Sequence, residues 1–141
     1  MADEKIERKI AVIFATDVVG FSKAMETNEN ETLKSLRKCR EILENLFTEH
    51  SGRIFNTAGD SVLAEFQSAV SAVVCASEFQ KFISNRNQSV NNEQKMEFRI
   101  GVNMGDVIVE GVNLYGEGVN IAARLESYCP IGGIAVSKNI Y

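Results

Sequence analysis

Two aspartates lie where an apolar segment meets a turn, a position suited to metal binding. Asp17 closely follows the apolar run Ile10–Ala15, and Asp60 follows Gly59 between two further apolar runs. A carboxylate at a strand end is well placed to hold a hard cation such as Mg²⁺ or Mn²⁺, and an adjacent glycine lets the backbone turn. The alternative is a pair of solvated turn aspartates, and the spacing alone favours neither interpretation.

Asn120 and Arg124 form a second candidate pair, four residues apart on an expected helix. This spacing places both side chains on one helix face. An arginine on a largely apolar helix needs an anion or solvent, so Arg124 could meet a phosphate. Taken alone, a salt bridge with Glu117 or Glu126 is the more common outcome.

Three further features are weaker on their own. The turn Val18–Phe21 offers backbone amides to a phosphate at an expected helix start, but without a GxxxxGK[ST] motif it also fits a plain structural turn. Arg99 alternates with Phe98 and Ile100, which indicates a solvated strand face. His50 is the only histidine and lies at an expected helix end, so the sequence indicates no Ser/His or Cys/His nucleophilic pair.

Hydrophobic spacing and turn residues predict elements in the order β-α-α-β-β-α-β-β-α-β. The predicted ranges are a strand at 10–15, a short helix near 21, a helix at 30–49, strands at 53–57 and 61–66, a helix capped by Ser68, a surface loop at 85–94, a hairpin of 95–103 and 107–111 turning at 104–106, a helix at 119–128 and a strand at 134–137.

This order contains a β-α-β-β-α-β core. It indicates an α+β, ferredoxin-like fold with helices packed on one face of a mainly antiparallel sheet. In such a layout the first strand lies beside the hairpin of 53–66. Asp17 at the exit of that strand would then approach Asp60 in the hairpin turn.

Composition indicates one soluble domain. The chain has 141 residues, of which 45% are hydrophobic and 24% charged, and its net charge is −4. The acidic balance argues against nucleic-acid partners, including RNA. Three widely spaced cysteines without a CxxC motif argue against disulfides or zinc and indicate a cytoplasmic protein. No apolar stretch approaches a membrane span, so we expect no membrane segment in this chain.

Taken together, four motifs in order resemble the class III nucleotidyl (adenylate/guanylate) cyclase catalytic domain, most closely its bacterial members. They are Phe14–Ser22, Thr57–Phe66, Phe98–Asp106 and Leu114–Glu126. The resemblance divides the chain into a charged N-terminal extension, residues 1–8, and a catalytic domain, residues 9–141. It also implies that this domain is incomplete at its C-terminus, because the family continues into strands that carry a phosphate-binding lysine.

The resemblance implies a reaction and its cofactors. ATP would become 3′,5′-cyclic AMP and pyrophosphate by in-line attack of the ribose 3′-oxygen on the α-phosphorus. Two Mg²⁺ or Mn²⁺ ions would be held by Asp17, Asp60 and the Val18 carbonyl, activating the 3′-hydroxyl and holding the triphosphate. The domains would pair head to tail as a homodimer, with an active site across the interface.

Further residue roles follow from the same resemblance. Phosphates would be bound by the amides of Val19, Gly20 and Phe21 and by Arg99. Asn120 of the partner subunit would orient the ribose, and Arg124 of the partner subunit would stabilise charge on the α-phosphate.

The base-binding positions depart from the common pattern of adenylate cyclases. Where those enzymes carry a lysine and an aspartate, this chain has Asn56 and Asn113. Asparagine both donates and accepts, so it can read adenine but also tolerate guanine. We expect ATP to be preferred, with a guanylate cyclase or a weakly active regulatory nucleotide-binding module as the alternatives.

Overall fold

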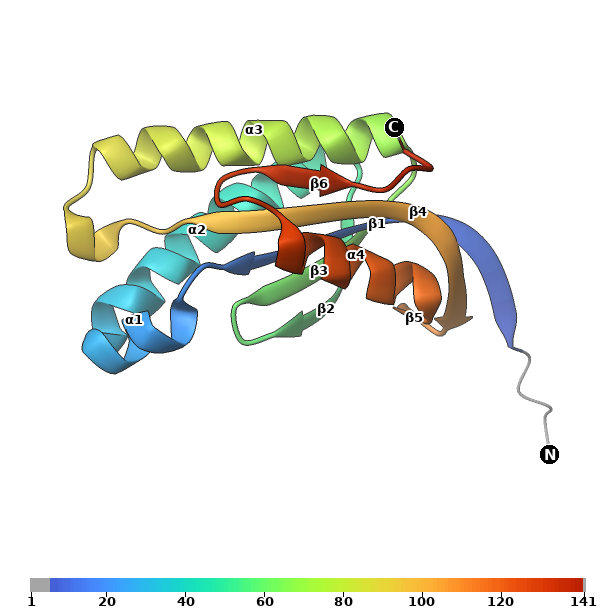
Figure 1. The fold of residues 1–141 in the computed structure, drawn as a ribbon, viewed down its shortest axis with the longest axis horizontal. Coiled ribbons are helices and arrows are strands. Elements are labelled where there is room, and N and C mark those ends of the chain that lie inside the picture. Colours follow the sequence, from blue (N-terminus) through green and yellow to red (C-terminus); the bar gives the residue numbers. More distant parts are fainter. Residues whose placement is uncertain (1–5, 141) are drawn as a thin grey trace.

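The strands form one central sheet, and the helices pack against it (Figure 1). The computed structural model describes residues 6–140. The strands are β1 (Glu7–Val18), β2 (Arg53–Ala58), β3 (Ser61–Phe66), β4 (Phe98–Glu110), β5 (Asn113–Tyr115) and β6 (Ile134–Val136). The helices are α1 (Phe21–Thr27), α2 (Glu29–Glu49), α3 (Ala69–Gln88) and α4 (Glu117–Tyr128), with a 3-10 turn η1 at Asn92–Gln94. The order of elements reads as predicted, but the predicted strands at 95–103 and 107–111 are both part of β4, and β5 was not predicted.

Two long antiparallel strands, β1 and β4, form the middle of the sheet. The strand order is β2-β3-β1-β4-β5, and the short β6 runs parallel to β4. The apolar run of β1 is buried from Ala11 to Thr16, as expected of a strand covered on both faces. Because β1 pairs with β3, the exit of β1 lies next to the β2–β3 turn.

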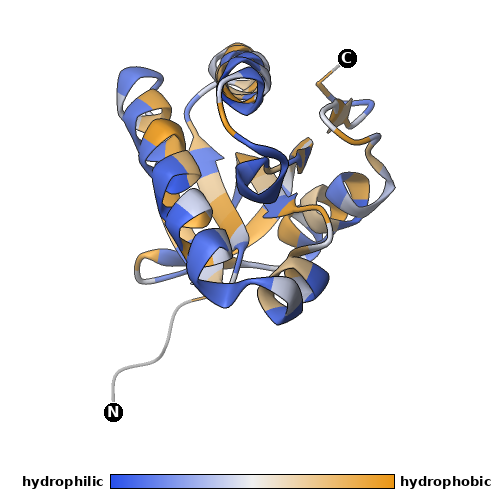
Figure 2. Ribbon diagram, turned by 90° about the vertical axis from the view of Figure 1, so that its left-hand side faces the viewer, coloured by the Kyte–Doolittle hydropathy of each residue, from blue (hydrophilic) through white to orange (hydrophobic). Residues whose placement is uncertain are grey.

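Alternating side chains of β1 fill two cores, one on each face of the sheet. Val12 and Phe14 belong to the core that α2 and α3 complete, whereas Ile13 and Ala15 belong to the core that α4 completes. Figure 2 shows largely hydrophobic strands enclosed by helices with hydrophilic outer turns. Among residues 6–140, no helix is long and apolar enough to cross a bilayer.

The expected α+β class with a mainly antiparallel sheet is confirmed. The placement of one helix differs from the expectation, because α4 covers the face opposite α2 and α3. Its buried residues Val119 and Ala122 give it an apolar stripe that packs against β1 and β4.

The predicted turn at 104–106 is wrong. These residues continue β4, where Gly105 pairs with Ala11 and Asp106 pairs with Ile10. The glycine suggested a hairpin, but β1 is long enough to pair with the whole of β4. The chain turns instead at Gly111, whose φ of +60° suits glycine.

The predicted loop at 85–94 is also shorter than expected. Helix α3 continues to Gln88, and η1 occupies the end of the segment. The cap predicted for α3 is confirmed, since the Ser68 hydroxyl accepts the N–H of Ser71 at 3.0 Å.

Candidate active site

The end of β1 and the β2–β3 turn bring Asp17 and Asp60 to the same corner of the sheet. Asp60 Oδ2 accepts the backbone N–H of Val18 at 2.9 Å, which ties the turn to the residue after Asp17. Gly59, with a φ of +59°, allows the tight turn that presents Asp60. The proximity expected from the topology is therefore present in the structure.

Arg99 lies directly across the sheet from Asp17, because the β1–β4 register pairs these two residues. Its Nη2 is 3.6 Å from Asp17 Oδ1, and its Nε is 3.9 Å from Glu126 Oε2 on α4. Its Nη1 donates to the Ser127 carbonyl at 3.2 Å. Arg99 is thus half-buried among polar groups, which replaces the solvated strand face indicated by alternation alone.

Three buried polar atoms of this cluster have no hydrogen-bond partner among the described residues. They are Asp17 Oδ1, Arg99 Nε and Glu126 Oε2 when both carboxyl groups are ionised, whereas a protonated Glu126 would donate a hydrogen bond to Asp17. Buried polar atoms are nearly always satisfied, so three together mark a site whose geometry serves something other than stability.

The two carboxyl groups beside Arg99 have perturbed pKa values. Burial raises the pKa of Asp17; a hydrogen bond with Glu126 and the charge of Arg99 oppose this, and the nearby charge of Asp60 adds to it. Burial, reinforced by the charge of Asp17, raises the pKa of Glu126 to about 7. The corner thus concentrates negative charge that a bound cation would stabilise.

The oxygen donors at this corner fit a hard divalent cation. Asp17 and Asp60 supply carboxylates, and Asp17 Oδ1 is a buried acceptor without a protein donor. Among residues 6–140, the convergent group of three metal-ligating side chains is elsewhere, at Glu49, His50 and Glu78. There His50 Nε2 and Glu78 Oε2 lie 2.8 Å apart, so the two side chains already pair with each other.

The turn after β1 differs in one respect from the expected phosphate cradle. The Val19 amide donates to the Glu97 carbonyl at 2.8 Å, so this N–H is already used. Gly20 precedes α1 with a φ of +66°, a left-handed conformation in which its carbonyl accepts from Ala24. Gly20 and Phe21 lie at the helix start, as the sequence indicated.

The candidate residues of α4 lie on its exposed face. Asn120 and Arg124 are both exposed, whereas Gly118, Val119 and Ala122 face the sheet. Among the described residues Arg124 forms no ion pair, so the salt bridge that was the more common alternative is not present. Both side chains are free to reach another molecule.

The expected base-binding residues lie on two different strands. Asn56 is exposed on β2. Asn113 begins β5, where its amide group donates to the Tyr115 hydroxyl at 3.0 Å and its oxygen accepts the N–H of Leu114 at 2.9 Å. No hydrogen bond joins Asn56 to Asn113 in the described part of the chain.

Comparison with known proteins identifies the family. The sequence profile described as "Adenylate and Guanylate cyclase catalytic domain" matches residues 3–141. The chain belongs to this family. The cyclase domain is 44% identical over 142 residues to "Putative adenylate cyclase 3" of Rhizobium meliloti, covering 100% of this chain and 24% of that protein. The chain thus spans about a quarter of that relative's length.

Solved structures agree with this assignment. The adenylate/guanylate cyclase/hydrolase from Silicibacter pomeroyi superimposes with a TM-score of 0.88 at 35% identity, covering 96% of this chain and 80% of that chain. The guanylyl cyclase Cya2 gives a TM-score of 0.87 at 29% identity, covering 96% and 78%. The cyclase domain therefore has the fold of both adenylate and guanylate cyclases.

The cyclase domain has one site residue that sequence reasoning missed. Glu126 was considered only as a salt-bridge partner for Arg124, yet its side chain is buried on the opposite face of α4, beside Arg99. The signal was available, because Val119, Ala122 and Glu126 follow helical spacing on the apolar stripe. A carboxylate on such a stripe requires a polar partner.

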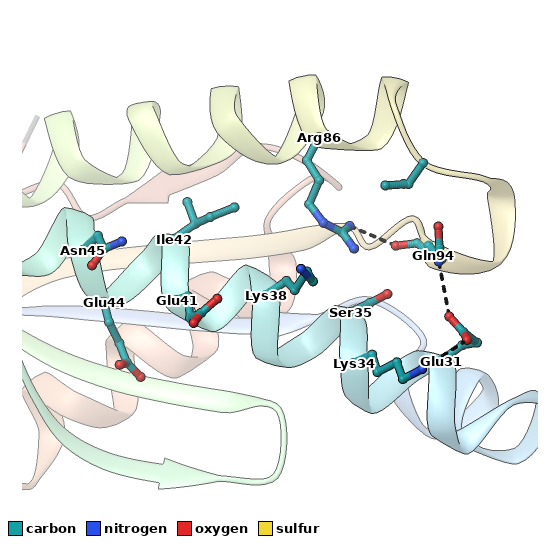
Figure 3. Close-up of a pocket in the computed structure, with 11 residues that line it drawn as sticks. Glu31, Lys34, Ser35, Lys38, Glu41, Ile42, Glu44, Asn45, Arg86 and Gln94 are labelled. Carbon is teal, nitrogen blue, oxygen red and sulfur yellow. Dashed lines mark hydrogen bonds and ion pairs between the residues drawn. The ribbon is translucent and has the colours of Figure 1, made fainter.

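A large groove lies elsewhere on the cyclase domain, between α2 and α3 (Figure 3). Its volume is about 700 Å³. Some of its polar groups are already paired: Arg86 donates to the Gln94 backbone carbonyl at 2.9 Å, and the Gln94 side chain donates to Glu31 at 3.3 Å. It contains none of the candidate catalytic residues.

Proposed function

We propose that this cyclase domain converts ATP to 3′,5′-cyclic AMP and pyrophosphate, as a head-to-tail homodimer in the cytoplasm. The observation that carries the proposal is the corner where Asp17, Asp60 and Arg99 meet, with buried acceptors and a cation side by side. The three cysteines are free and buried, which supports a reducing compartment.

Asp17, Asp60 and the Val18 carbonyl would hold two Mg²⁺ or Mn²⁺ ions. Such ions lower the pKa of a coordinated hydroxyl, here the ribose 3′-hydroxyl, and neutralise the triphosphate. The protein's part is to fix the two carboxylates, which the hydrogen bond from Val18 to Asp60 does for the β2–β3 turn. The register of β1 with β4 does the same for Asp17 and Arg99.

The phosphates would lie against the turn after β1 and against Arg99. Gly20 and Phe21 present the start of α1, and Arg99 offers a guanidinium that binds phosphate oxygens well. The role proposed for the Val19 amide requires that its N–H either break its hydrogen bond to the Glu97 carbonyl or donate to a phosphate at the same time.

The partner subunit would complete each site. Asn120 of the partner subunit would orient the ribose, and Arg124 of the partner subunit would stabilise the negative charge that grows on the α-phosphate. The exposure of both side chains supports this, and Arg124 forms no ion pair with the described residues of its own subunit. A preorganised donor of this kind contributes on the order of 100- to 1000-fold in rate.

We propose that ATP is the preferred substrate and that Asn56 and Asn113 bind its adenine base. Adenylate cyclase is the activity named for the Rhizobium meliloti relative, whereas Cya2 is named a guanylyl cyclase. Parallel assays with ATP and GTP decide the matter. Greater cyclic AMP output supports the proposal, and equal or greater cyclic GMP output overturns it.

The test of the catalytic proposal is Mn²⁺-dependent formation of cyclic nucleotide by variants of the two aspartates. Asp17→Asn and Asp60→Asn remove one negative charge each at nearly constant size, and we expect each to abolish measurable turnover. Asp106→Asn, an exposed aspartate on β4, is the matched control and should retain full activity. Unchanged turnover in either site variant would refute the proposal.

A further inference from the structure

Glu126, on α4, lies beside both Arg99 and Asp17. We infer that Glu126 is a positioning residue, which holds the Arg99 guanidinium so that it meets the terminal phosphates of the substrate. This inference rests on the proposed function, because it assigns Arg99 to those phosphates. It adds a residue that acts through Arg99 and need not touch the substrate.

The last turn of α4 contacts Arg99 at two points. The Glu126 carboxylate lies 3.9 Å from Nε, and the Ser127 carbonyl accepts from Nη1 at 3.2 Å. The third nitrogen, Nη2, faces Asp17 Oδ1 at 3.6 Å. The guanidinium therefore contacts α4 through Nε and Nη1, and it contacts Asp17 through Nη2.

The backbone of α4 is seated so closely on β4 that Glu126 has little freedom. A Cβ atom on Gly101 would lie 2.4 Å from both the Ala122 carbonyl oxygen and the Glu126 nitrogen, so only glycine allows this approach. At the other end of the helix, the buried Asn103 amide donates to the Gly118 carbonyl at 2.9 Å. These two contacts fix the helix along its length.

Glu126 is more than nine-tenths buried, and in its ionised form its Oε2 has no hydrogen-bond donor within the described range. A buried carboxylate is costly unless it compensates a nearby cation. Arg99 is the cation beside it, and Arg99 in turn has Asp17 as its other carboxylate. If Asp17 is engaged by metal ions in the working enzyme, Glu126 and the Ser127 carbonyl remain to orient the guanidinium. A guanidinium that is already held in place loses less conformational entropy when it binds phosphate.

The test is calorimetric binding of inorganic pyrophosphate with Mg²⁺ to this chain, because pyrophosphate reports the phosphate position without the base or ribose. We expect Glu126→Gln and Arg99→Ala each to weaken pyrophosphate binding by about tenfold, the scale of a charge-assisted hydrogen bond. The double variant should bind no more weakly than Arg99→Ala alone, since both changes remove one interaction. Glu117→Gln, an exposed glutamate in the first turn of the same helix, is the control and should bind normally.

Two further measurements separate positioning from other roles. Binding of Mn²⁺ alone should be unchanged in Glu126→Gln, and a loss would overturn the inference by making Glu126 a metal ligand. Glu126→Asp keeps the charge but withdraws it by one methylene, so it should weaken pyrophosphate binding while thermal unfolding stays cooperative. This second variant serves as the test if the glutamine variant does not fold.

The outcomes distinguish the inference from the proposed function. If Arg99→Ala weakens pyrophosphate binding and neither Glu126 variant does, the positioning role is wrong and the proposed function stands. If Arg99→Ala binds pyrophosphate normally, or the unaltered chain does not bind it, the phosphate site assigned to Arg99 is wrong and the inference fails with it.

Discussion

At the residue scale, the candidate site consists of four charged side chains from four parts of the chain. Asp17 comes from β1, Asp60 from the β2–β3 turn, Arg99 from β4 and Glu126 from α4. Asp17, Arg99 and Glu126 each have a buried atom without a partner, and burial raises the pKa of Asp17 and of Glu126; both features are unfavourable for stability. This is the usual cost of a preorganised site.

The raised pKa of Glu126 makes stability of the metal-free protein depend on pH. The folded protein retains a proton on Glu126 up to about pH 7, whereas the unfolded chain loses it near the ordinary glutamate pKa of 4.5. The unfolded state therefore binds fewer protons between these values, and the free energy of unfolding falls as pH rises through this range. In urea titrations with EDTA, Glu126→Gln should show a shallower fall than the parent. An equal fall in both proteins would contradict this.

Residue types and spacing alone predicted part of the site. Asp17 and Asp60 were identifiable because each carboxylate stands at a strand end beside a turn. Arg99 was predicted only through the family resemblance, because its position opposite Asp17 depends on the β1–β4 register. Helical spacing places Glu126 on the buried stripe of α4, but its partner depends on the sheet face that α4 covers, which no local pattern encodes.

At the element scale, α4 serves two purposes with two faces. Its buried face carries Glu126 to Arg99 in its own subunit, and its exposed face carries Asn120 and Arg124. If these reach the partner's site as proposed, one helix contributes to two sites. The close packing of α4 against β4 then determines the geometry of both sites.

Gly101→Ala tests the importance of this close packing. The added methyl group would clash with backbone atoms of α4 at 2.4 Å, so the helix must move. We expect a loss of about 1–3 kcal/mol in the free energy of unfolding, together with reduced activity. Gly105→Ala on the same strand is the control, because its nearest neighbour is the Asn103 side-chain amide at 3.1 Å, and it should lose less. Equal losses would argue against a special contact at Gly101.

Elements with strong hydrophobic periodicity were predicted well, whereas strands whose extent depends on pairing with a distant strand were not. The spacing of α2 and the cap of α3 are local features, and the structure has both. The division of β4 into two strands failed because Gly105 resembles a turn residue. Only the partner strand β1, long enough to pair through it, keeps this segment extended.

At the scale of the whole molecule, the sheet separates the larger hydrophobic core from the side that carries the candidate site. Helices α2 and α3 complete the larger core on one face, whereas α4 and the ends of β1 and β4 carry the candidate site. In the proposed dimer neither subunit is sufficient, because Asp17 and Asp60 act with Asn120 and Arg124 of the partner subunit. Loss of a residue from one set should therefore be compensated by a subunit that retains it.

The most direct measurement of this claim is complementation between two inactive variants. Asp17→Asn and Arg124→Ala should each lack Mn²⁺-dependent cyclase activity alone. In an equal mixture, half of the dimers should be mixed and each should have one intact site, so activity should recover to about one quarter of the parent value. A mixture of Asp17→Asn with Asp60→Asn is the control and should stay inactive, since both changes affect the same half of a site. Failure of the first mixture to recover any activity, in dimers shown to exchange subunits, would contradict the account.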